Sequence, residues 1–208
     1  ENQTVSLFII NDEKGKMVGS VQEMAGYHES LDLRDEVKQK GKDKVLADLQ
    51  QSFGADIKVS NLAIDSLRML EEPIYLKYDI DFNGEKEDII YFNPLLAFAR
   101  KENPFKSAVR AYPVEMPYTM DYAYTLQMEV PAGYVVDELP QSVVVKLNEA
   151  NEGIFEYRIS QSGSNISFRT RVQIARAYFL PEEYDMLREF FNLIVKKHGE
   201  QIVFKKKP

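Results

Sequence analysis

Two histidines are the main candidates for acid–base chemistry in this sequence of 208 residues. His28 stands in "GYHES", where Glu29 and Ser30 follow it, so that a Ser-His-acid set is present in the local sequence. Sequence neighbours rarely point toward one another, and the G-x-S-x-G pattern of hydrolase nucleophiles is absent from the sequence. His198 stands in "KKHGE" and is expected to be a cation at the C-terminal end of a helix. We therefore predict no catalytic residues and a protein that is not an enzyme.

Metal and cofactor chemistry finds little support in the residue types. The sequence contains no Cys, which excludes thiolate nucleophiles, disulfides and cysteine metal sites. It has no Gly-rich phosphate loop and no pair of histidines at ligand spacing. We expect no cofactor and no metal site.

One acidic stretch resembles the start of a calcium loop. Asp79, Asp81 and Asn83-Gly84 fit the pattern D-x-D-x-N-G, but the twelfth position, where a bidentate Glu belongs, is Ile90. Alternating residues on both sides predict strands rather than the helices of a calcium-binding hand. The Asn-Gly pair is typical of a tight hairpin turn, so we predict a hairpin there.

Tyrosines provide the candidate ligand surface. Tyr112, Tyr118 and Tyr122 form an aromatic series, with Tyr124 two positions further on. Exposed rings of this kind bind sugars or peptides, whereas rings on an alternating strand are more often core residues or cross-strand pairs. We name Tyr112, Tyr118 and Tyr122 as the candidate surface for a ligand or partner.

Charge and hydropathy limit the partners. The formal net charge of −7 gives no general attraction to nucleic acid, and we predict no nucleic acid partner. No stretch approaches the roughly 20 apolar residues that a membrane span requires. We therefore expect no membrane span in this chain, and any export signal would precede residue 1.

The first half of the chain is predicted to contain a hairpin, then two helices, then further strands. Residues 4–27 read as a hairpin around "NDEKGK", and two helical segments follow before Gly54. Residues 74–82 alternate strictly and predict a strand with one buried face, and a second strand is expected at residues 89–92.

The second half of the chain is rich in alternating strands. Apolar residues recur at every second position over residues 122–130, 143–147, 155–159 and 166–174, which predicts antiparallel strands with one buried face. A helix over residues 181–198 has Pro181 at its first turn and Gly199 as its stop. The segment "QIVFKK" after it is expected to be an edge strand or a docked tail.

The predicted fold class is α+β, rich in antiparallel β-sheet. Four prolines crowd residues 93–118 and place a domain boundary near residue 102. Residues 1–102 are predicted to be a smaller strand-helix-strand module. Residues 103–208 are predicted to be a β-sandwich-like domain with the helix at residues 181–198. The pattern leaves open whether the two halves share one continuous sheet.

Three segments carry a resemblance to a known family: residues 103–118 ("NPFKSAVRAYPVEMPY"), 130–143 ("VPAGYVVDELPQSV") and 178–206. They resemble the C-terminal region, a domain of unknown function, of bacterial transglutaminase-like proteins. "GSVQEMAGYHESLDLRD" in the first half is similar to the segment that follows the transglutaminase core. Such a core uses a Cys-His-Asp set, and because this chain has no Cys, no catalytic residue is carried over.

The resemblance implies a non-catalytic accessory module of an extracytoplasmic, envelope-associated bacterial protein. Its expected partner is a neighbouring transglutaminase-like domain of the same polypeptide, with an envelope protein or a glycan as a further candidate. The alternatives are a glycan- or peptide-binding module that uses the exposed tyrosines and, more remotely, an uncharacterised hydrolase.

Overall fold

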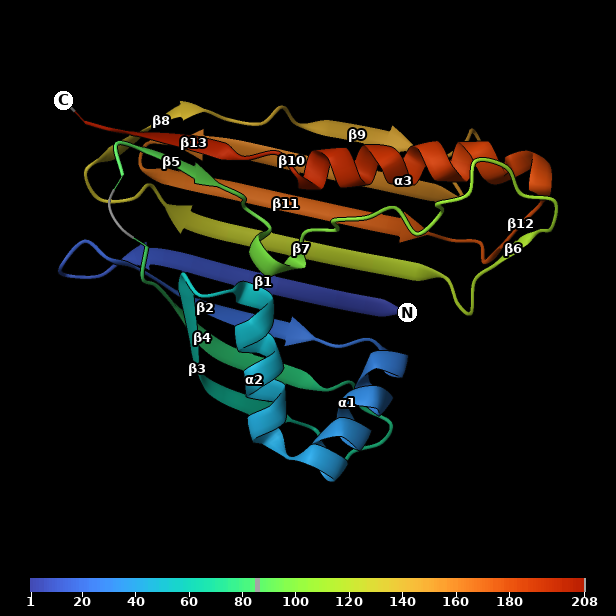
Figure 1. Cartoon of the computed structure of the whole chain (residues 1–208), viewed down its shortest axis with the longest axis horizontal. Coiled ribbons are helices and arrows are strands. Elements are labelled where there is room, and N and C mark those ends of the chain that lie inside the picture. Colours follow the sequence, from blue (N-terminus) through green and yellow to red (C-terminus); the bar gives the residue numbers. More distant parts are fainter. Residues whose placement is uncertain (85–86, 208) are drawn as a thin grey trace.

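A single large sheet runs through both halves of the chain (Figure 1). The computed structural model describes residues 1–84 and 87–207. Within these residues an eight-stranded sheet has the order β3-β4-β2-β1-β7-β11-β10-β9. Its neighbouring strands are antiparallel except for β1 and β7, which pair in parallel with Leu7 opposite Leu126. The predicted α+β class, rich in antiparallel sheet and with a C-terminal helix, is confirmed.

The elements follow the predicted order closely. The strands are β1 (Asn2–Asn11), β2 (Met17–Met24), β3 (Ile57–Asp65), β4 (Tyr75–Phe82), β5 (Ile89–Phe92), β6 (Val114–Glu115), β7 (Met120–Glu129), β8 (Tyr134–Glu138), β9 (Val143–Lys146), β10 (Gly153–Ser162), β11 (Asn165–Ile174), β12 (Tyr178–Phe179) and β13 (Ile202–Lys206). The helices are α1 (Tyr27–Lys40), α2 (Lys42–Phe53) and α3 (Tyr184–His198), with 3-10 turns η1 (Leu96–Phe98) and η2 (Pro181–Glu183).

The opening hairpin of β1 and β2 is confirmed. The Asp12 carboxylate accepts hydrogen bonds from the backbone N–H groups of Lys14 and Lys16, both at 2.8 Å, and Gly15 takes a positive φ of 72°. A carboxylate bonded to its own turn and a glycine in the left-handed region are what a tight reversal requires. The local sequence is therefore sufficient to form this turn.

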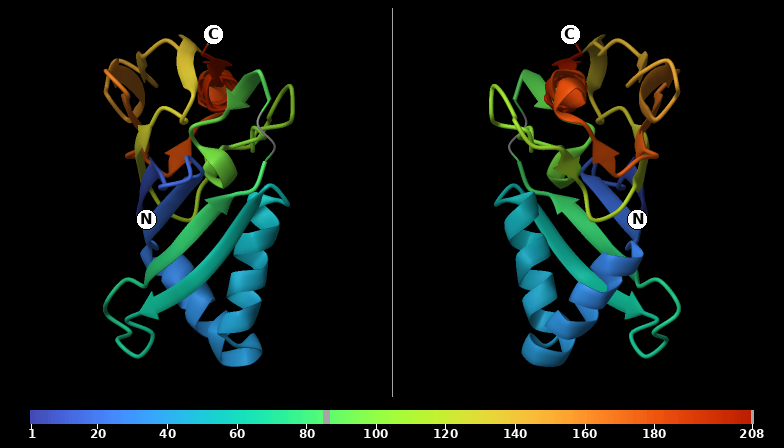
Figure 2. Two further views of the ribbon diagram at one scale, coloured as in Figure 1. Left: turned by 90° about the vertical axis from the view of Figure 1, so that its left-hand side faces the viewer. Right: turned by 90° about the vertical axis from the view of Figure 1, so that its right-hand side faces the viewer.

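The helices cover one face of the large sheet, and the opposite face is open to solvent (Figure 2). α1 and α2 lie over the part of the sheet formed by β2, β4 and β3 (Figure 1). α3 lies along β10 and β11, and its predicted core face of Tyr184, Leu187, Phe191 and Ile194 is buried. Alternation along each strand explains this arrangement, because only one of its two faces is apolar.

A chain of aromatic rings joins the two halves through the core. Phe53 of α2 contacts Phe98, Phe98 contacts Tyr124 of β7, and Tyr124 contacts Phe168 of β11, with centroid separations of 5.9, 5.5 and 5.9 Å. Phe168 in turn lies 4.8 Å from Tyr157 of β10. The two predicted segments therefore share one sheet and one continuous aromatic core, and the boundary near residue 102 stays a prediction.

The predicted hairpin between β4 and β5 is wrong. β5 pairs with β13 in a separate sheet of order β5-β13-β8, in which Phe92 is opposite Ile202. The backbone N–H of Asn83 donates to the carbonyl of Asp56 at 2.7 Å, so the chain continues beside β3 instead of reversing. Burial of Phe92 against Phe204, 6.1 Å away, favours this pairing over the local turn preference of Asn-Gly. The rest of the predicted turn, residues 85–86, lies outside the described residues.

The C-terminal segment is also placed differently from the expectation. β13 is the central strand of the three-stranded sheet and not an edge strand or a docked tail. Ile202 and Phe204 are both fully buried. A central strand is favoured because both edges of this short apolar segment then find backbone partners.

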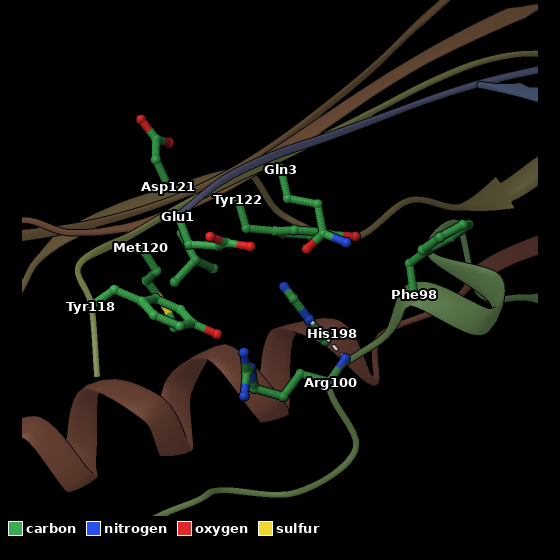
Figure 3. Close-up of a pocket in the computed structure, with 10 residues that line it drawn as sticks. Glu1, Gln3, Phe98, Arg100, Tyr118, Met120, Asp121, Tyr122 and His198 are labelled. Carbon is green, nitrogen blue, oxygen red and sulfur yellow. Dashed lines mark hydrogen bonds between the residues drawn. The ribbon is translucent and has the colours of Figure 1, made fainter. Parts of the chain in front are cut away.

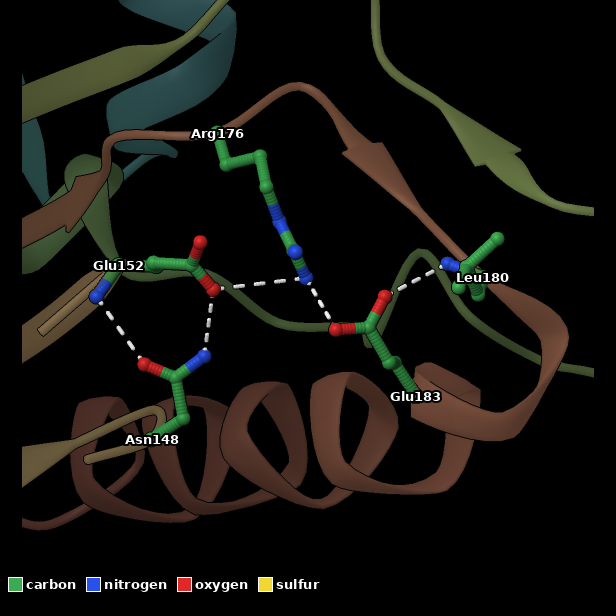
Figure 4. Close-up of polar contacts among 5 residues, drawn as sticks. All are labelled: Asn148, Glu152, Arg176, Leu180 and Glu183. Atoms are coloured by element: carbon green, nitrogen blue, oxygen red, sulfur yellow. Dashed lines mark hydrogen bonds and ion pairs between the residues drawn. The ribbon is translucent and has the colours of Figure 1, made fainter. Parts of the chain in front are cut away.

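Arg176 fixes the start of α3 to the loop before β10 (Figure 4). Its guanidinium is paired with Glu183 of η2 and lies 3.5 Å from the Glu152 carboxylate. Glu183 also accepts the N–H of Leu180 at 2.7 Å, and Asn148 donates to Glu152 at 2.6 Å. This cluster stabilises the N-terminal end of α3, whereas His198 lies at its C-terminal end.

No helix among residues 1–84 and 87–207 combines the length and the hydropathy that crossing a bilayer requires.

Candidate ligand-binding pocket

A pocket of about 370 Å³ opens where the first residues of β1, the start of β7, the segment after η1 and the end of α3 meet (Figure 3). Phe98, Met120 and Val172 form its apolar wall. Its polar and ionisable lining comprises Glu1, Gln3, Arg100, Tyr118, Tyr122 and His198, together with Asp121 at its edge. These residues are far apart in the sequence and meet only in the folded chain.

His198 forms part of the inner wall of the pocket. It is the last residue of α3 and only 2% exposed. Its Nδ1 accepts a hydrogen bond from the backbone N–H of Arg100 at 3.1 Å. In a neutral imidazole one ring nitrogen accepts and the other carries the proton, so the proton of His198 is on Nε2.

The Nε2 atom of His198 is buried and has no hydrogen-bond partner within the described residues. Figure 3 shows it pointing toward the space between Glu1 and Tyr122. A buried N–H without a partner costs about 1–3 kcal/mol. An acceptor brought by a ligand would remove this cost.

Burial, together with the nearby Arg100 charge, lowers the pKa of His198 to about 4. His198 is therefore neutral at pH 7, and the expectation that it is a cation at the helix end is wrong. The helix dipole favours a charged imidazole, but loss of solvent outweighs it when the ring is buried against Phe155, 5.8 Å away.

Arg100 supplies the positive charge of the pocket. Its guanidinium is half-buried and lies 5.4 Å from the centre of the Phe191 ring. Burial lowers its pKa, but from an ordinary value so high that the group stays cationic at pH 7. Among the described residues its guanidinium has no ion pair with a carboxylate. No sequence pattern indicates a role for Arg100, which lies in the proline-rich stretch where a domain boundary is predicted.

The three candidate tyrosines are not all in the pocket. Tyr118 and Tyr122 line it, whereas Tyr112 lies in the loop before β6 and is 79% exposed. The Tyr118 ring stacks on His28 with centroids 4.6 Å apart and an angle of 11° between the planes. Burial, reinforced by nearby Glu23, raises the pKa of Tyr122, so its hydroxyl stays protonated. Tyr124 is a core residue whose O–H donates to the Pro94 carbonyl at 2.7 Å.

The two carboxylates at the pocket have partners of their own. Glu1 accepts the N–H groups of His28 and Glu29 at 3.1 and 3.2 Å, at the positive end of α1. Asp121 accepts two hydrogen bonds from Arg171, at 2.7 and 2.5 Å, and this pairing lowers its pKa. Figure 3 shows the Asp121 carboxylate turned away from the other pocket side chains.

The lining residues offer donors and a cation but little that could act as a nucleophile or a base. None of them is Ser, Thr, Lys or Cys. The acceptor nitrogen of His198 is already bonded to the backbone, so it is not available to remove a proton. The local set at His28 does not assemble either, because Ser30 is buried and its Oγ accepts the N–H of Ile74 at 2.9 Å. Among the described residues, this pocket combines an imidazole N–H without an acceptor and a guanidinium without a carboxylate, which are groups that can bind an acceptor or an anion.

The stretch that begins like a calcium loop is a strand. Asp79 and Asp81 lie on β4. The Asp79 carboxylate accepts from Asn61 at 2.8 Å, and Lys16 lies 3.7 Å from Asp81. Residues 1–84 and 87–207 contain no group of three His, Cys, Asp or Glu placed to hold a metal ion.

A comparison with models of protein families gives a match. The model of a family described as "Domain of Unknown Function with solved-structure structure" (DUF3858) matches residues 88–204, more than half of the chain. The matched region runs from the start of β5 into β13 and includes Arg100, Tyr118, Tyr122 and His198. Searches of the curated proteins and of the solved structures found no match.

Proposed function

Because the chain belongs to the DUF3858 family, a domain of unknown function, we propose that it is a non-catalytic binding module whose pocket at His198 receives a ligand. One observation carries this proposal. A guanidinium without a carboxylate partner and a buried imidazole N–H without an acceptor meet in one pocket of the described structure. Such groups are costly for a fold to maintain, and a ligand that pairs with both would offset the cost.

We also propose that the module is the C-terminal, accessory part of a transglutaminase-like bacterial envelope protein and works outside the cytoplasm. The resemblance of residues 103–118, 130–143 and 178–206 supports this context. The partner would be the transglutaminase-like domain of the same polypeptide. In this arrangement the catalytic domain would perform the chemistry and the module would hold a segment or ligand near it.

A second candidate is a surface for glycans or peptides built from exposed tyrosines. The 79% exposure of Tyr112 favours it, since a large ring in solvent is a ready stacking platform. Tyr112 and Tyr118 therefore distinguish the two proposals. Of these two tyrosines, only Tyr118 contributes to pocket binding, whereas the tyrosine surface depends on Tyr112 as well.

The experiment is a fragment and glycan screen on the 208-residue chain, followed by amide chemical shifts in two-dimensional ¹H–¹⁵N NMR spectra. Saturable changes at the amide of Arg100 are expected, and Tyr118→Ala should weaken them about tenfold. Tyr112→Ala is the matched control and should leave the affinity unchanged. Loss of binding in Tyr112→Ala would favour the tyrosine surface, and a screen without any change in the pocket would refute the proposal.

Catalysis is tested separately with amide and glycoside model substrates. We expect no turnover above the uncatalysed rate. Turnover that disappears in His198→Gln, with the fold preserved, would overturn the non-catalytic assignment and favour the hydrolase.

A further inference from the structure

We propose that the group received by the pocket is a carboxylate attached to an apolar body, bound by the Arg100 guanidinium and the Nε2–H of His198. This inference rests on the proposed binding function and names its ligand class. It is carried by the donors, the charge balance and the apolar wall of the pocket.

The donors come from two residues that are hydrogen-bonded to one another. The backbone of Arg100 is bonded to His198 Nδ1, so the two residues are fixed to one another through the same contact that sets the tautomer. Figure 3 shows the Arg100 and Tyr118 side chains and His198 Nε2 directed into the same space. A planar guanidinium can give two parallel N–H groups to a carboxylate, and the imidazole N–H can give a third.

The charge balance favours a monoanion. Arg100 contributes one positive charge, and His198 is neutral because it is buried. The Glu1 carboxylate at the rim accepts hydrogen bonds from the first N–H groups of α1, and the α-ammonium of the same residue, which donates to the Thr119 carbonyl at 2.6 Å, balances its charge. A carboxylate is matched by a single guanidinium, whereas a phosphate dianion would keep an uncompensated charge.

The apolar wall of the pocket indicates what the remainder of the ligand, beyond its carboxylate, should be. Phe98, Met120 and Val172 are apolar, and the Tyr122 ring lies beside them on the inner face of β7. A hydrocarbon or aromatic body is stabilised by burying its surface against such side chains. A pocket of about 370 Å³ is at the small end of ligand sites, so it fits one such group rather than an extended chain.

The experiment compares three probes that share a phenyl ring by NMR titration of the whole chain: 3-phenylpropionate, 3-phenylpropanamide and phenyl phosphate. The carboxylate should bind at the pocket at least about tenfold more tightly than the neutral amide, because charge-assisted hydrogen bonds are lost in the amide. Arg100→Gln should lower the affinity for 3-phenylpropionate about tenfold or more, and Arg100→Lys should lower it by a smaller factor. Arg68→Gln, in an exposed loop outside the pocket, removes the same charge and should leave the affinity unchanged.

The ¹⁵N signals of the His198 ring give a second readout. Carboxylate binding should shift Nε2 and its proton while Nδ1 keeps its bond to Arg100, even in Arg100→Lys. Equal binding of amide and carboxylate, tighter binding of phenyl phosphate, or an unchanged affinity in Arg100→Gln would overturn the carboxylate assignment and leave the binding module standing. If 3-phenylpropionate leaves the pocket signals unchanged while other fragments shift them, the carboxylate assignment also fails. Failure of every fragment in the screen would instead refute the proposed function itself.

Discussion

The carboxyl group of Glu23 should make this protein less stable as the pH rises. Glu23 lies on the inner face of β2, is 8% exposed and accepts a hydrogen bond from the Tyr78 hydroxyl. Burial raises its pKa from 4.5 to about 7; the Tyr78 hydrogen bond acts in the opposite direction, and the Glu29 carboxylate raises the value further. Glu23→Gln keeps an oxygen that accepts from Tyr78 and removes the titration.

The sign follows from the direction of the shift. The folded state holds the proton of Glu23 more tightly than the unfolded state. The resulting contribution to the free energy of unfolding is complete below the unfolded pKa of 4.5 and is lost as the pH rises through about 7. A shift of this size corresponds to about 3 kcal/mol in total. Between about pH 5 and about pH 8, the wild-type protein should lose about 2–3 kcal/mol of unfolding free energy relative to Glu23→Gln.

The assay is urea denaturation of both proteins at about pH 5, 6.5 and 8. The difference between wild type and variant cancels the titration of groups that do not interact with Glu23, including His198. A difference that stays constant to within about 0.5 kcal/mol over this range would refute the reasoning, because it would mean that Glu23 is ionised in the folded state throughout.

Two further substitutions test the sheet and the helix anchor. Gly19→Ala should destabilise the fold by about 1–3 kcal/mol in urea, because its Cβ would lie 2.7 Å from the Phe8 carbonyl oxygen on β1. Gly84→Ala meets open space and is the control; an equal loss in both variants would contradict the clash. Arg176→Gln breaks the ion pairs at the start of α3 and should cost about 1 kcal/mol by thermal or urea unfolding. An unchanged midpoint would mean that Glu183 is sufficient to cap the helix by itself.

Much of the fold could be predicted because it is encoded locally. Tyr124, Leu126 and Met128 alternate with polar neighbours, and all three are buried on one face of β7. The helix at the C-terminal end was marked by its apolar spacing, and Tyr184 and Leu187 are buried as that spacing requires. Periods of two and 3.6 residues identify strands and helices without knowledge of the partner.

Pairing between distant segments was not predictable in the same way. The Asn83-Gly84 pair favours a hairpin on local grounds, but the partner of β5 is β13, more than one hundred residues further along the chain. The parallel pairing of β1 with β7 is equally distant. The free energy gained from a local turn preference is small compared with that gained by burying Phe92 and Phe204, and this burial requires the complete chain.

The candidate site could be predicted only in part. Tyr118 and Tyr122 were named from the aromatic series and line the pocket, whereas Arg100 carried no signal. His198 is expected from its position at the C-terminal end of a helix to be a cation. The protonation state of His198 depends on how deeply its ring is buried. Other elements of the fold bury this ring, and the neighbouring residues in the sequence do not indicate that they do so.

The sequence by itself determined which segments are strands and helices and which of their faces are apolar, since those properties follow from the spacing of side chains along the backbone. Only the tertiary structure decided that residues 1, 100, 118, 122 and 198 share one pocket. It also decided that His198 is neutral with its proton on Nε2. The physical reason is that hydrogen-bond partners and loss of solvent are properties of the space around a side chain, and five separate stretches of the chain create that space.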